Sequence, residues 1–148
     1  MSDSINYPVK MLRGISSFNS IKDGLVTSSA FQFDHFARQD GYRELSITWY
    51  ENEEALDTIK KQKKDDESIQ FKAGIAELDI SDLKVALKPH FIRKTMRYEK
   101  SPTRTNKYHG NLLLKDGTDR ELEKMIRAGL ANNAGENIYP NEYYSENE

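Results

Sequence analysis

Apolar residues recur at helical spacing near the C-terminal end of the chain, and this pattern constrains the fold most. They are Leu122, Met125, Ile126 and Leu130. The spacing gives one apolar stripe along a helix, and Thr118 with Glu121 has the form of a capping box at its start. A helix of this kind is stabilised mainly by burying its stripe. The pattern therefore predicts an amphipathic helix over Thr118–Asn132 that covers another element of structure.

Period-two alternation elsewhere in the chain predicts strands. It is clearest in Leu45–Tyr50, where the odd-numbered residues are apolar and share one face. The other segments with strand character are Leu25–Phe33, Ile69–Leu78, Phe91–Tyr98 and Tyr108–Leu114. A second helix is expected over Asn52–Lys64, with Asn52 as its N-cap.

Together these elements predict a single α+β domain over residues 1–136. Its mainly antiparallel sheet of about five strands would be covered by the two helices. Met1–Gly24 is the least specified part, and adds either a strand at Val9–Ile15 or none. Residues 137–148 contain acids, asparagines and tyrosines but no basic residue. We expect them to form an acidic mobile tail.

The overall composition bounds the class of protein. The 148 residues carry a net charge of −2 and include no cysteine. A chain without cysteine has no disulfide and no thiolate metal site, which fits a cytoplasmic address. No apolar run is long enough to span a bilayer, so no membrane association is expected. The histidines, His35, His90 and His109, lack the spacings of metal-binding motifs, and neither a metal nor a cofactor is expected.

The stretch Lys84–His109 departs from this near-neutral balance. It holds eight basic side chains and one acid, Glu99, so its formal charge is +7 while the remaining residues sum to −9. The basic residues are Lys84, Lys88, Arg93, Lys94, Arg97, Lys100, Arg104 and Lys107. Basic side chains attract phosphates, and the interleaved aromatic rings and imidazoles can stack or move protons. The asymmetry indicates an anionic partner.

Strand parity makes this prediction more specific. We expect the last two predicted strands to pair in antiparallel fashion with their apolar faces inward. Their other faces would then bring together Arg93, Arg97, His109 and Asn111. The guanidinium groups would bind phosphate or carboxylate, and His109 would act as an acid or base near neutral pH. The alternative is an ordinary solvated sheet face whose arginines pair with neighbouring acids.

An arginine, a strand serine and a later strand glutamate also occur in order along the chain. They are Arg13, Ser28 or Ser29, and Glu77. This order resembles the three-point layout of ADP-ribosyltransferases. The resemblance implies that the arginine holds a phosphate of a nicotinamide dinucleotide. It also implies that the serine orients the ribose and that the glutamate supports the transfer.

Three further blocks occur in sequence order. They are DGLVTSSAF (Asp23–Phe31), ELSITW (Glu44–Trp49) and NKYHGNLL (Asn106–Leu113). They resemble a set of small uncharacterised bacterial proteins with VTS-x-AF, LS-[IV] and N-x-x-H blocks. The resemblance implies that Thr27–Phe31 and Asn106–Leu113 belong to one site, and it favours His109 over His35 and His90.

The leading interpretation is a small intracellular protein that binds a phosphate-bearing or otherwise anionic partner, such as a nucleotide or nucleic acid, through the basic 84–109 region. Its expected binding residues are Arg93, Arg97, Lys107 and Asn111. One alternative is an enzyme acting on a nucleotide or nucleic acid. It would be nuclease-like with His109 as the catalytic residue, or ADP-ribosyltransferase-like with the Arg13 set. The other alternative is a protein-interaction module that uses the acidic tail and the exposed second helix.

Overall fold

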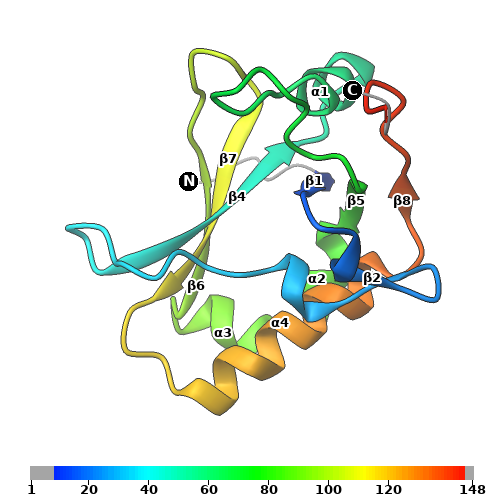
Figure 1. The fold of residues 1–148 in the computed structure, drawn as a ribbon. Coiled ribbons are helices and arrows are strands. Elements are labelled where there is room, and N and C mark those ends of the chain that lie inside the picture. The colour runs from blue at the N-terminus through cyan, green and yellow to red at the C-terminus, as the bar shows by residue number, and fades with distance from the viewer. Residues whose placement is uncertain (1–8, 146–148) are drawn as a thin grey trace.

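A six-stranded antiparallel sheet organises residues 9–145, which the computed structural model describes. Its strands are β1 (Lys10–Ile15), β4 (Tyr42–Trp49), β5 (Gly74–Asp79), β6 (Met96–Lys100), β7 (His109–Lys115) and β8 (Ile138–Tyr139). They lie in the order β6-β7-β4-β1-β5-β8, and each neighbouring pair is antiparallel (Figure 1). The predicted α+β class with a mainly antiparallel sheet is confirmed.

Helices and a small ribbon complete the described part of the fold. The α-helices are α1 (Glu53–Lys60), α2 (Ile80–Ala86), α3 (Lys88–Ile92) and α4 (Arg120–Ala134). Two short 3-10 turns, η1 (Phe18–Ser20) and η2 (Ser28–Ala30), flank the two-stranded ribbon formed by β2 (Ile21–Lys22) and β3 (Leu25–Val26). In Figure 1, α1 lies at one end of the molecule, and α3 and the start of α4 lie at the other.

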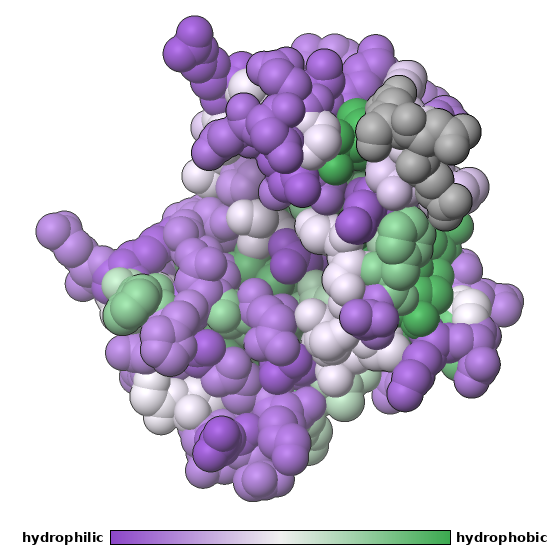
Figure 2. Space-filling model, in the orientation of Figure 1, coloured by the Kyte–Doolittle hydropathy of each residue, from purple (hydrophilic) through white to green (hydrophobic). Residues whose placement is uncertain are grey.

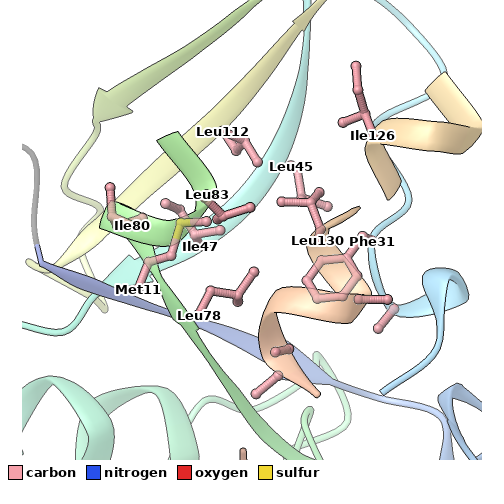
Figure 3. Close-up of a cluster of buried hydrophobic side chains, with 14 of the residues drawn as sticks. Met11, Phe31, Leu45, Ile47, Leu78, Ile80, Leu83, Leu112, Ile126 and Leu130 are labelled. Atoms are coloured by element: carbon pink, nitrogen blue, oxygen red, sulfur yellow. The ribbon is translucent and has the colours of Figure 1, made fainter. Parts of the chain in front are cut away.

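Each broad face of the sheet carries its own apolar cluster. Figure 3 shows the larger one, in which α2 and α4 pack against the strands through Met11, Phe31, Leu45, Ile47, Leu78, Ile80, Leu83, Leu112, Ile126 and Leu130. On the opposite face, α1 places Leu56 and Ile59 against Leu12 and Ile75. Because consecutive strand residues point to opposite faces, β1 contributes Met11 to one cluster and Leu12 to the other.

The two predicted helices form, with different ends. Asn52 caps α1 as expected, since its side chain accepts a hydrogen bond from the Ala55 N–H at 3.0 Å. For α4 the expected capping box is wrong. Asp119 is the N-cap and accepts hydrogen bonds from two backbone N–H groups, whereas the Thr118 hydroxyl donates to the Lys115 carbonyl. An aspartate placed one residue later satisfies the free N–H groups of the first turn equally well.

Three of the predicted strands are shorter than expected or begin later. The strand expected over Leu25–Phe33 ends at Val26, and η2 follows it. The strand expected over Ile69–Leu78 begins only at Gly74. The strand expected over Phe91–Tyr98 begins at Met96, because the preceding residues form α3. Pro89 lies in the first turn of that helix, where its fixed φ and missing N–H are favourable.

The ends of the described chain are more structured than expected. The optional strand at Val9–Ile15 forms as β1 and lies in the interior of the sheet between β4 and β5. The expected tail begins with β8, which pairs with β5. Beyond it, the Asn141 amide is buried and donates hydrogen bonds to the carbonyls of Lys60 and Phe71. Ordered structure therefore continues past residue 136. Residues 146–148 of the expected tail lie outside the described part.

The surface is strongly polar. The face drawn in Figure 2 is mostly hydrophilic, and apolar residues reach it only in separate small areas. Large apolar side chains that remain exposed include Val85 on α2 and Ile92 on α3. Within residues 9–145, none of the helices combines the length and the apolar character that crossing a bilayer would require.

Candidate anion-binding groove

The pairing of β6 with β7 follows the expected antiparallel arrangement. Arg97 lies opposite Leu113, and Glu99 lies opposite Asn111. Met96, Tyr98, Leu112 and Leu114 belong to the larger core cluster. The alternate residues, Arg97, His109 and Asn111, therefore share the other face of the sheet. Arg93 does not join them, because it caps the C-terminal end of α3 and precedes β6.

Carboxylates from β4 and from β6 itself lie on this polar face and pair with Arg38, which precedes β4. The Asn111 amide donates to Glu44 of β4 and to Glu99 of β6, at 3.0 Å in each case. Arg38 donates to the same two carboxylates, at 3.2 Å and 2.7 Å, and also pairs with Asp40. The hydrogen bond from Arg38 is the main reason that the pKa of Glu99 lies below its ordinary value. The face is a paired network and presents no open cluster of positive charge.

His109 and Lys107 also have internal partners. The His109 Nδ1 lies 2.8 Å from the Ser101 carbonyl oxygen. Because a carbonyl oxygen only accepts, Nδ1 carries the proton in this contact. The Lys107 ammonium lies 3.5 Å from a carboxylate oxygen of Glu54, and that charge raises the pKa of Lys107. Both side chains thus connect the loop before β7 to its surroundings.

A concentration of basic groups lies instead beside the outer edge of β6. A groove of about 790 Å³ is lined by Lys84, Val85, Lys88, Phe91, Ile92, Lys94, Met96, Arg97 and Tyr98. The lining thus combines four cations with five apolar or aromatic residues, and it includes no acid. Val85 and Ile92 are 78% and 68% exposed. A groove that combines an apolar surface with a few charged side chains is the usual form of a ligand site.

Local sequence signals build the walls of this groove. Asp79 caps α2, and this helix buries Ile80 and Leu83 so that Val85 faces outward. Lys94 has a φ of 61° and its N–H donates to the Phe91 carbonyl, which ends α3 and turns the chain into β6. The chain thereby returns along the helix that it has just left, and the groove lies between them.

Ring contacts hold the two sides of the groove in place. The rings of Phe91 and Tyr98 stack with centroids 4.7 Å apart and an interplanar angle of 18°. This contact fixes α3 against β6. The Arg97 guanidinium lies 5.2 Å from the centre of the Tyr42 ring, within the range of a cation–π interaction. Arg97 is therefore both a lining residue of the groove and a neighbour of the polar face.

The residues of the ADP-ribosyltransferase resemblance are separated by the sheet. Arg13 lies opposite Ala76, whose side chain is in the larger cluster, and it donates to the Ala30 and Ser46 carbonyls. Glu77 lies opposite Leu12 on the other face. There its carboxylate accepts a hydrogen bond from Tyr139 and pairs with Lys10. Ser28 and Ser29 lie in η2. The structure does not bring the arginine and the glutamate into one site.

The three sequence blocks are brought together only in part. Block Glu44–Trp49 pairs with block Asn106–Leu113 through β4 and β7. The Asn106 amide also donates to the Thr48 hydroxyl at 2.9 Å. Thr27–Phe31 lies against α4, where Arg127 donates to the Phe31 carbonyl, and Phe31 enters the same core cluster as Leu45 and Leu112. His109 points to the opposite face of the sheet from Phe31 and Leu112, so the blocks share a core but His109 does not lie beside Thr27–Phe31.

Lys84, Lys88 and Lys94 belong to the basic stretch seen in the sequence, but the sequence predicts no binding role for them. Pro89 in the sequence indicates the end of a helical turn at Leu87, and in the structure it also lies in the first turn of α3. Comparisons with known proteins add no further guide, because no family model, curated protein or solved structure matches this chain.

Proposed function

We propose that this protein binds a phosphate-bearing or otherwise anionic partner in the groove between α2, α3 and β6. The observation that carries the proposal is the composition of the lining, which has four cations and no acid. Within residues 9–145, Lys88 and Lys94 have no carboxylate partner. Lys88 and Lys94 can therefore bind a ligand without first breaking an ion pair.

The proposed binding surface lies at the β6 edge of the sheet, whereas the sequence predicts it on the polar sheet face. Of the residues expected from the sequence, Arg97 lines the groove. Arg93 directly precedes Lys94, another lining residue, in the chain. Lys107, His109 and Asn111 bond to other parts of the protein. A groove in which all the charges have one sign attracts anions even in a protein whose net charge is −2.

Salt dependence provides a quantitative test. For single-stranded nucleic acid, the logarithm of the binding constant falls with the logarithm of salt concentration by about 0.7 for each neutralised phosphate. If all four cations contact phosphates, the slope is about −3. Removing two of the cations should reduce the slope by about 1.4 and weaken binding roughly tenfold.

The experiment measures the fluorescence anisotropy of a labelled oligothymidylate at several salt concentrations. The test variant is Lys88→Ala/Arg97→Ala. The matched control is Lys63→Ala/Lys64→Ala, which removes the same charge near the end of α1, far from the groove (Figure 1). We expect the groove variant to lose affinity and the control to keep it. Equal affinity of the groove variant and the unmodified protein, or loss of binding in the control alone, would refute the assignment. Competition by a nucleoside triphosphate then separates a nucleotide site from a nucleic-acid site.

A further inference from the structure

The strand β6 forms one edge of the sheet. It pairs with β7 on its inner side, and no strand of residues 9–145 pairs with its outer side. The Lys115 N–H donates to the Thr95 carbonyl, and the Ser101 N–H donates to the His109 carbonyl. These two bonds fix which residues of β6 bond to β7.

The alternation of an antiparallel ladder then gives the direction of every peptide group in β6. Arg97 and Glu99 lie two residues from the bonded Thr95 and Ser101, respectively. In an antiparallel ladder every second residue points the same way, so the N–H and C=O groups of Arg97 and Glu99 also point toward β7. The N–H and C=O groups of Met96 and Lys100 therefore point outward. An outward row of this kind is a template for another strand.

The groove lies directly beside this edge. Met96, Arg97 and Tyr98 belong both to β6 and to the lining of the groove. Successive side chains of an added strand would point alternately to the two faces of the sheet. One set would lie over the groove, where it would contact Ile92 and the lysines. The other set would lie near Arg97 on the polar face.

We propose that the occupant of the groove is an extended acidic peptide segment that adds to β6 as an outer strand. This inference rests on the proposed function, because it assumes that the groove accepts anions. Main-chain hydrogen bonds to the edge would provide affinity, and the cations would select acidic side chains. Because Val85 and Ile92 are exposed, we expect apolar residues between the acids of the partner to pack against them.

Other occupants fit the observations less well. A second copy pairing through its own β6 would bring Lys94 and Arg97 against the same charges, which are repulsive. The described part of the protein's own acidic segment, up to residue 145, is held elsewhere, since Tyr143 donates to Asp57 on α1. A nucleic acid has no peptide groups to match the edge. A base also has little ring surface of Tyr98 to stack on, because this side chain is 3% exposed and already stacked on Phe91.

The test compares two peptides of the same charge with the repeat Leu-Leu-Glu-Glu, which places both leucine and glutamate on each face of an added strand. One is unmodified, and the other is N-methylated at alternate residues so that it cannot donate hydrogen bonds from one edge. Two protein variants complete the design. Lys100→Pro removes an outward N–H, which an edge strand tolerates, and Lys100→Ala removes the same charge but keeps the N–H. Labelled oligothymidylate serves as the reference anion.

We expect the unmodified peptide to bind at least tenfold more tightly than the N-methylated one. We also expect Lys100→Pro to bind it at least tenfold more weakly than Lys100→Ala, while both variants bind oligothymidylate equally. Equal binding of the two peptides overturns strand addition even if Lys100→Pro fails to fold. Binding of oligothymidylate without either peptide overturns the inference but leaves the proposed function intact, whereas binding of none of the three probes overturns both.

Discussion

Arg38 is predicted to be the residue on which the polar sheet face depends. It donates to Glu99 at 2.7 Å and to Glu44 at 3.2 Å. The same two carboxylate oxygens each lie 3.0 Å from the Asn111 amide nitrogen, so they are within 6 Å of each other. The change Arg38→Gln removes the only cation that contacts both carboxylates among the described residues. It leaves two negative charges side by side.

The magnitude follows from the exposure of the three side chains. Arg38, Glu44 and Glu99 are 27%, 33% and 31% exposed, so solvent weakens each attraction to about 0.5–1 kcal/mol, and the third pair, with the more exposed Asp40, contributes less. Repulsion between two carboxylates at this separation adds about 1 kcal/mol in a solvent-like dielectric. The free energy of unfolding at pH 7 should therefore fall by about 2–3 kcal/mol.

The effect should depend on pH with a definite sign. In the unmodified protein Arg38 holds the pKa of Glu99 below its ordinary value. This contribution to stability is complete above the ordinary pKa and is lost as the pH falls through the lowered pKa. In the variant, repulsion raises the pKa of one carboxylate, so protonation relieves strain. The destabilisation caused by Arg38→Gln should thus be largest at pH 7 and shrink toward pH 4.

Urea unfolding followed by the fluorescence of Trp49 measures both effects. The control is Arg38→Gln/Glu99→Gln, in which the repulsion is absent and part of the stability should return. A change smaller than about 0.5 kcal/mol at pH 7 would show that the network contributes no more than ordinary surface charges. A destabilisation that is the same at pH 7 and pH 4 would show that the loss is one of packing and does not arise from charge.

Two further substitutions test the packing. Gly110→Ala should lower the free energy of unfolding by about 1–3 kcal/mol, because the added Cβ would lie 2.3 Å from the Trp49 Nε1 in a filled part of the core. Thermal unfolding measures this loss, and a melting temperature equal to that of the unmodified protein would contradict it. Asn141→Ala should cost about 2 kcal/mol, because it leaves the carbonyls of Lys60 and Phe71 without this donor. In limited proteolysis, cleavage after β8 should become faster than in the unmodified protein, and an unchanged rate would count against the anchoring role of Asn141.

The elements that the sequence predicts well each have one apolar face in the core. In β4, Leu45, Ile47 and Trp49 all enter the larger core. On the other face Ser46 is exposed, while Thr48 is buried and accepts a hydrogen bond from Asn106. In α4, Ile126 and Leu130 of the predicted stripe are buried and Leu122 packs at its edge, whereas Met125 is 55% exposed and lies outside the buried face. Such elements show their burial directly as a period of two or 3.6 residues. For them, the pattern in the sequence and the geometry of the fold carry the same information.

Elements buried on both faces give no comparable period. In β5, Ile75 packs under α1 while the next residue, Ala76, enters the core under α4, and both are fully buried. Strands in the interior of a sheet that is covered on both sides read as continuous apolar runs. The apparent alternation of Ile69, Phe71, Ala73 and Ile75 instead extends the predicted strand back to Ile69, whereas β5 begins at Gly74. Only the arrangement of the helices above and below the sheet fixes such a boundary.

The sequence does not show which basic residues of the candidate site are paired with acids. The excess of +7 in Lys84–His109 is a correct sum, but the acids that neutralise it lie far away in the chain. Lys100 pairs with Glu51 and Lys107 with Glu54, both from the loop and helix that follow β4. These pairs form because β4 is the neighbour of β7 in the sheet. Strand order therefore decides which cations remain free to bind a ligand. Lys88 of α3 has no carboxylate partner among residues 9–145, and it lies beside β6, the last strand on its side of the sheet.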